Sequence, residues 1–264
     1  MNPKQKIIVL AHARSGSNSL MDALNKHPKI DLLREPFNES RPNWKKGLKN
    51  YKKELKDSKS LNKILQKIFK KHNGFKTLVY QIPKKYGKNL FSRRGMKVIV
   101  LYRKNKLKSA VSLEIAKQTR AWHVKDRSKA KSKNIGHLNI DNLRNFIRFT
   151  KESMQERADL LERLNVPYME VSYEEIHEAK RSKRLRKVKE IFEFLGYEIP
   201  DEKEMEEIDK VLSPQEKNSE KRPIHEDTKH QGSGEEFRFK RKRTSFLFCQ
   251  ISFINFPELI FKWS

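Results

Sequence analysis

Short runs of consecutive apolar residues recur along the chain and predict strands at Lys6–Ala11, Lys76–Tyr80, Lys97–Tyr102 and Tyr168–Ser172. Within each run the apolar residues mostly follow one another instead of alternating with polar ones. That pattern is typical of a strand covered on both faces, as in a parallel sheet. A shorter apolar run, Ile30–Leu33, lies between the first two predicted strands.

Apolar residues spaced three or four positions apart predict helices between these strands. Such spacing follows the first strand at Leu20, Met21 and Leu24, and the third strand at Leu107, Val111 and Ile115. The longest pattern predicts a helix over 141–164 with Asp141 as its N-cap. Its apolar stripe consists of Leu143, Phe146, Ile147, Met154, Leu161 and Leu164. A further helix over 185–195 ends before Gly196, a typical residue just after a helix.

The alternation of strands and helices predicts an α/β fold: a single P-loop-like domain with a mostly parallel central sheet flanked by helices. We assign this domain to residues 1–212, with a lysine-rich helical insertion on the surface at about 43–73. Residues 213–244 lack periodicity and indicate a loop or a disordered basic linker. Residues 245–264 are apolar but are interrupted by polar residues, which makes them a poor membrane span. A core strand, an interfacial anchor and a non-native tail all fit that last segment.

Charge adds an attraction to anions, because 60 Lys and Arg residues face 33 Asp and Glu and leave a net charge of +27. Nucleic acid, an anionic membrane, an acidic glycan and a phosphorylated nucleotide all fit, as does a lysine-rich surface with no specific partner. The single cysteine, Cys249, excludes a disulfide framework and a Cys-ligated structural zinc. The apolar run near the N-terminus is too short for a secretory signal, so we expect a cytoplasmic protein.

The segment between the first strand and its helix combines features of an anion site. It reads Ala11-His12-Ala13-Arg14-Ser15-Gly16-Ser17-Asn18-Ser19. A glycine at this turn allows a positive φ and a close approach of a ligand to the backbone amides. The N-terminus of the following helix adds free N–H groups and a positive dipole end. The spacing and the lysine of a Walker A loop are absent, so the pattern predicts a phosphate or sulfate site of another kind.

A second polar group follows the strand Lys97–Tyr102. Arg103 stands at its carboxyl end, and Ser109 and Ser112 fall on the next helix. An arginine and a helical serine that converge there would bind a second phosphate, away from the first loop. The alternative is that these side chains face solvent.

Together the two segments resemble the nucleotide-binding segments of sulfotransferases that use 3′-phosphoadenosine 5′-phosphosulfate (PAPS). HARSGSNSL resembles the 5′-phosphosulfate loop, and YRKNKLKSAVS resembles the segment that binds the 3′-phosphate. Bacterial carbohydrate sulfotransferases of the trehalose and nodulation-factor type are the most similar members. REPF, VSYEEI and IFEFLGY extend the resemblance over about residues 5–200. No segment after Gln231 matches the one with which the family usually closes over the nucleotide.

This resemblance implies a role for each matching residue. The donor would be held by Arg14, Ser15, Gly16, Ser17, Asn18, Ser19, Arg103, Ser109 and Ser112. Arg14 would also stabilise the leaving group, and Glu35 would act as the base. His12 is the second candidate base. For Glu35 the alternative is a surface ion pair with Arg34.

We therefore expect a sulfotransferase that moves the sulfuryl group from PAPS to a hydroxyl of a carbohydrate or glycolipid, by in-line displacement and without a metal. Gln81 is a candidate acceptor contact. A peripheral membrane contact and an oligomer remain open, whereas RNA-binding signatures are absent. Two alternatives stand beside this one: a basic nucleotide- or RNA-binding protein and a P-loop-like kinase.

Overall fold

A computed structural model describes residues 5–38, 51–120 and 136–213 of the chain. All the described helices and strands lie in one compact unit, Met1–Glu216. The apolar segment 245–264, Cys249 and nearly all of the linker 213–244 lie outside the described residues.

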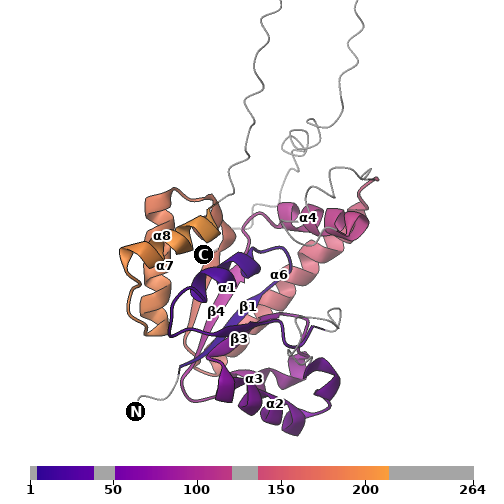
Figure 1. The fold of residues 1–264 in the computed structure, drawn as a ribbon. Coiled ribbons are helices and arrows are strands. Elements are labelled where there is room, and N and C mark those ends of the chain that lie inside the picture. Colours follow the sequence, from indigo (N-terminus) through magenta and orange to yellow (C-terminus); the bar gives the residue numbers. More distant parts are fainter. Residues whose placement is uncertain (1–4, 39–50, 121–135, 214–264) are drawn as a thin grey trace, which may run out of the picture. The chain divides into compact units, whose positions relative to one another are not determined.

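Five parallel strands form the central sheet in the order β2-β3-β1-β4-β5 (Figure 1). They are β1 Lys6–Ala11, β2 Leu32–Arg34, β3 Gly74–Leu78, β4 Met96–Tyr102 and β5 Tyr168–Ser172. β1 lies in the middle, paired on both sides, and its last five residues are buried. The predicted α/β fold with a mostly parallel sheet is confirmed.

The strand boundaries follow the apolar runs except at β3. The prediction of 76–80 is wrong by two residues at both ends. The strand begins at Gly74, which pairs with Ile7 of β1. The two backbones lie so close that a Cβ atom on Gly74 would be 1.8 Å from the carbonyl oxygen of Ile7. Tyr80 lies beyond the strand and is half exposed. The run Ile30–Leu33 leads into the short strand β2.

Helices cover both faces of this sheet. The described ones are α1 Ser17–Leu24, α2 Ser58–Lys71, α3 Gly87–Phe91, α4 Lys106–Thr119, α6 Ile140–Arg163, α7 Arg181–Leu195 and α8 Glu202–Leu212. Short turns add η1 Tyr51–Glu54, η2 Lys84–Tyr86 and the π-helical η4 Glu174–Glu178. One core cluster joins β1 to α1, α7 and α8, and the other joins it to α2, α3 and α6. Successive residues of β1 point to opposite clusters, which explains its unbroken apolar run.

The predictions for three helices need correction. The helix predicted over 185–195 is α7, which begins four residues earlier, at Arg181. The long helix begins one residue earlier than expected, and Asn139, not Asp141, caps it by accepting from the N–H of Asn142. On α4 the expected stripe at Leu107, Val111 and Ile115 is only half buried; the fully buried positions are Ser109, Ala110, Ala116 and Thr119. The buried face of α4 consists of small residues. A prediction based on the spacing of large apolar residues therefore assigned the wrong face of this helix to the core.

Within the segment 43–73, the described residues contain η1 and α2, and α2 packs into the core. Asp57 and Ser60 form a capping box at the start of α2. The helix then buries Leu61, Ile64 and Leu65 in the core. Its lysines cover the opposite face, which makes it amphipathic. None of the described helices is long and apolar enough to cross a membrane.

Candidate functional site

The segments that carry the predicted residues meet at the carboxyl edge of the sheet. The loop 12–16 follows β1, Glu35 follows β2, and Arg103 follows β4. In an open parallel sheet this edge is where ligands bind. Figure 1 shows α1 and α4 above the same end of the strands.

The loop after β1 has two residues with positive φ. Gly16 has φ 78°, as its position at the turn predicts, and it is the N-cap of α1. Arg14 has φ 64°, which is uncommon for a residue with a side chain. No side chain caps α1, so the N–H groups of its first turn are available to an anion. Ser15 is fully buried, and its hydroxyl donates to the carbonyl of His12 at 2.8 Å, which fixes the loop from within.

Gly16 also meets a constraint from η4. A Cβ atom on this residue would lie 2.6 Å from Nε2 of His177 and 2.7 Å from Cδ2 of Tyr173. Both rings occupy the space that a side chain would need. Glycine is therefore required here for packing as well as for its backbone angle.

Direct hydrogen bonds join the two segments that resemble nucleotide-binding motifs. Nε of Arg14 donates to Oγ of Ser112 on α4 at 3.0 Å. The backbone N–H of Arg103 donates to Nε2 of His12 at 3.2 Å. The sequence analysis assigned each motif to a different phosphate. In the structure, however, the side chain of Arg14 in the first motif contacts Ser112 in the second motif. Ser19, the last residue of the first motif, is half buried on α1.

His12 is brought to the site, but both ring nitrogens already have partners. With Nε2 accepting from Arg103, Nδ1 carries the proton and donates to the carbonyl of Ala13 at 2.8 Å. Burial lowers the pKa of His12, with Lys106 and Arg103 adding to the effect. A neutral imidazole held at both nitrogens positions the ends of β1 and β4 and has no lone pair left for a substrate proton.

The second motif leaves polar atoms unused. The guanidinium of Arg103 lies 4.1 Å above the ring of Tyr173 and 3.6 Å from Glu178, yet its buried Nε has no hydrogen-bond partner. Ser109 is fully buried, and its Oγ also has none. A buried polar group without a partner costs free energy, and a bound acceptor of hydrogen bonds at this place would remove that cost.

Glu35 lies in a buried polar cluster and does not pair with Arg34 at the surface. Its side chain is 5% exposed, and Oε1 lies 2.5 Å from Nζ of Lys76. Oε2 accepts from Asn38 at 2.5 Å and from Gln81 at 2.9 Å. Arg34 instead forms an ion pair with Asp22 of α1. The surface ion pair considered for Glu35 is therefore not formed.

Lys76 is the functional candidate that the sequence did not single out. It is 1% exposed, and Nζ donates to Oδ1 of Asn18 at 2.6 Å and to Oγ of Ser17 at 3.2 Å. One ammonium thus joins the carboxylate of Glu35 to the first turn of α1. The available signal was a lysine inside an otherwise buried strand, since an interior charge must be paired.

Gln81 is fixed in a single orientation beside this cluster. Its Oε1 accepts from the N–H of Leu78 at 2.9 Å, so the amide nitrogen faces Glu35. Arg157 of α6 holds the surrounding loop, because Nη2 donates to the carbonyl of Ile82 at 2.8 Å. Next to Gln81, the half-exposed Tyr80 contacts the exposed Phe149 of α6, with 6.3 Å between ring centroids.

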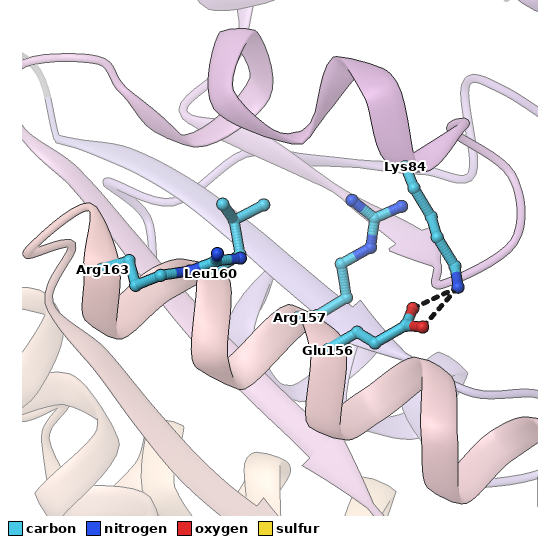
Figure 2. Close-up of a pocket in the computed structure, with 5 residues that line it drawn as sticks. All are labelled: Lys84, Glu156, Arg157, Leu160 and Arg163. Carbon is cyan, nitrogen blue, oxygen red and sulfur yellow. Dashed lines mark hydrogen bonds and ion pairs between the residues drawn. The ribbon is translucent and has the colours of Figure 1, made fainter.

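A pocket of about 240 Å³ lies on the other side of Arg157 (Figure 2). It is lined by Lys84, Glu156, Arg157, Leu160 and Arg163. The ion pair between Lys84 and Glu156 spans its edge. None of the predicted site residues lines this pocket, so it is not the candidate site.

The described residues contain no group of three or more His, Cys, Asp or Glu side chains arranged to hold a metal ion. The polar atoms gathered at the edge of the sheet are instead cations, hydroxyls and amides around one carboxylate. Such a set binds oxyanions and orients a hydroxyl.

The chain was compared with known proteins. No curated protein matches the chain. Among solved structures, the crystal structure of mouse sulfotransferase SULT7A1 complexed with PAP matches at 18% identity, with a TM-score of 0.44. The match covers 80% of this chain and 65% of that one. The family model described as Stf0 sulphotransferase matches residues 88–222, just over half of the 264 residues. This region contains the second motif, α6 and η4, and the chain belongs to the Stf0 sulphotransferase family.

Proposed function

We propose that this sulfotransferase takes the sulfuryl group from PAPS and transfers it to a hydroxyl of a carbohydrate, with Glu35 as the base. The observation that carries this proposal is the position of Lys76 between Glu35 and the first turn of α1. A sulfuryl group passing from donor to acceptor must lie between a base and the site of the leaving phosphate. Lys76 touches both sides.

The donor fits the residues around the loop. A 5′-phosphate at the start of α1 would accept from the backbone N–H groups there. The unpartnered Nε of Arg103 and Oγ of Ser109 are donors that a second phosphate would satisfy. A nucleotide with both a 5′- and a 3′-phosphate uses both regions, which AMP does not. The printed title of the mouse structure describes a sulfotransferase bound to PAP, a nucleotide of this kind.

During transfer the bond between sulfur and the oxygen of the 5′-phosphate breaks while a bond from sulfur to the acceptor oxygen forms. The acceptor hydroxyl passes its proton to Glu35. Negative charge grows on the leaving phosphate, where Lys76, Arg14 and the N–H groups of α1 stabilise it. Fixed donors of this kind need no rearrangement when the charge develops.

Glu35 is ready for this role in orientation, because two amides and one ammonium hold it. Asn38 and Gln81 both donate to Oε2, and Lys76 pairs with Oε1. These three contacts hold both carboxylate oxygens in place before an acceptor hydroxyl arrives.

The acceptor side favours a sugar. Tyr80 and Phe149 present exposed aromatic surface next to Gln81. Pyranose rings have an apolar face that packs on aromatic rings while their hydroxyls form hydrogen bonds.

The first experiment measures binding of 3′-phosphoadenosine 5′-phosphate (PAP) by calorimetry, with AMP and ATP as comparators at two salt concentrations. PAP should bind at least tenfold more tightly than AMP, and Arg103→Ala should remove this preference. Arg93→Ala is the matched control, since Arg93 is also partly buried but precedes β4 at the opposite edge of the sheet. Equal, salt-sensitive binding of all three nucleotides would contradict the proposal.

The second experiment follows radiolabelled sulfate from PAPS to trehalose and chitotetraose, with p-nitrophenol as a non-carbohydrate acceptor. We expect labelled sugar and no labelled phenol. Labelled phenol alone would retain the donor assignment and overturn the carbohydrate acceptor.

A further inference from the structure

A buried histidine lies directly behind the proposed donor loop. His177 of η4 is 6% exposed, and its Nδ1 donates to the carbonyl of Leu212, the last residue of α8, at 2.9 Å. A carbonyl can only accept, so Nδ1 carries the proton and the neutral ring leaves Nε2 bare. Nε2 has no hydrogen-bond partner. The Gly16 backbone lies beside it.

The surroundings keep this imidazole neutral while no anion is bound. Burial lowers the pKa of His177 most strongly; the backbone of Leu212 and Gly16 opposes this effect, and Arg184 and Arg103 add to it. The positive charge of Arg184 is offset by Asp209 of α8, with 2.7 Å between Nε and Oδ1.

The remaining groups near the ring belong to η4 and to the second motif. Tyr173 stacks on His177 with 4.5 Å between ring centroids. On its other side Tyr173 contacts the guanidinium of Arg103, which also faces Glu178. His177 is therefore at the end of a stack that runs from the second motif to the back of Gly16.

An anion at the start of α1 changes this balance. Two negative charges would enter a region where burial and two arginines now disfavour an imidazolium. An opposite charge within a few ångströms favours the protonated form. Nε2 is the one ring position that can take the proton, and it points at the loop that would hold the anion.

We propose that His177 takes up a proton at Nε2 when the 5′-phosphate of the nucleotide occupies the loop before α1, and that the imidazolium helps to hold this phosphate. His177 is then a positioning residue of the donor site, and its hydrogen bond to Leu212 links α8 to that site. This inference rests on the proposed function, because it needs a nucleotide in the loop.

Proton uptake on binding of PAP is the direct test. Calorimetry at pH 7 in buffers with different ionisation enthalpies measures how many protons the complex gains. His177→Asn keeps an N–H donor for the carbonyl of Leu212 but cannot titrate. The control is His72→Asn, because His72 follows α2 at the opposite edge of the sheet and pairs with Asp31.

We expect the unmodified protein to take up more protons than His177→Asn, with His72→Asn unchanged. The affinity of the unmodified protein for PAP should also fall more steeply between pH 6 and pH 8 than that of His177→Asn. The extra loss of affinity should be about tenfold, which corresponds to a rise of one unit in the pKa of His177 on binding. Equal proton uptake by the two proteins, with PAP bound by both, would overturn the role of His177.

A variant that fails to fold does not end the test. The imidazole carbon resonance of His177, followed by NMR in the unmodified protein, should show a higher pKa with PAP than without it; an unchanged pKa contradicts the proposal. Absence of PAP binding to the unmodified protein is a different result, because it removes the proposed donor itself.

Discussion

The two sides of the candidate site differ in how completely their polar atoms are paired. Around Glu35, the contacts with Lys76, Gln81 and Asn38 use both carboxylate oxygens. Around the second motif, Nε of Arg103 and Oγ of Ser109 are buried without partners. The first side is fully paired without a substrate, whereas under the proposed function a bound nucleotide would complete the second. A catalytic group gains from fixed orientation, and a binding site gains from unsatisfied donors.

The largest effect should come from the ammonium that joins the two sides. Lys76→Met should lower the transfer rate by at least about a hundredfold, since it removes a fixed charge beside the leaving group. It also leaves Glu35 buried without its cation, which should cost about 3–5 kcal/mol of stability. Steady-state kinetics and thermal unfolding measure the two effects.

The double variant Lys76→Met with Glu35→Gln separates these effects. Removing the unpaired charge should recover most of the lost stability without recovering activity. Recovery of activity together with stability would mean that Lys76 serves only the fold.

Glu35→Gln alone should lower kcat by about a hundredfold to ten-thousandfold, the usual contribution of a general base. PAP affinity should change by less than twofold, because Glu35 lies on the side that is already paired. A loss of PAP binding similar to the loss of kcat would show that the two sides are not separate.

On the donor side, Arg103→Ala should weaken PAP by about tenfold to a hundredfold, as expected for one charged hydrogen-bond donor to a phosphate. AMP affinity should stay within about threefold. Calorimetry distinguishes this outcome from a uniform loss of all anions, which would indicate a general electrostatic effect.

Ser109→Ala gives the smallest and sharpest test. The hydroxyl has no partner in the ligand-free protein, so its removal should change unfolding free energy by less than about 1 kcal/mol or increase it. PAP affinity should nevertheless fall several-fold. Unchanged affinity would mean that the hydroxyl of Ser109 does not bind the nucleotide. Ser112→Ala provides the comparison on the same helix, because the hydroxyl of Ser112 already accepts a hydrogen bond from Arg14.

The sequence was most informative where function and local backbone coincide. A buried strand, a glycine turn and a helix start adjoin one another at Gly16, so the loop and its positive φ could be predicted. Arg103 and Ser109 could be proposed as ligands through the resemblance of their segment. Lys76 could not, because Ser17, Asn18 and Glu35, which it contacts, come from α1 and from the loop after β2, and only the sheet order brings these together.

The same limit applies to His177. It follows the VSYEEI segment by one position, but nothing local indicates that its ring fills the space behind Gly16. The hydrogen bonds of His12 could not be predicted for a related reason. Its second ring nitrogen meets Arg103, 91 positions away in the chain, and that contact decides whether a lone pair is left over.

The long helix α6 contacts two loops of the candidate site. α6 has 24 residues and is about 36 Å long. Its Phe146 contacts His12 after β1, Phe149 contacts Tyr80, and Arg157 holds the loop after β3. This one helix therefore contacts both the loop of the proposed donor site and the loop of the proposed acceptor site. In hydrogen exchange the two loops should open together with this helix, as one cooperative unit.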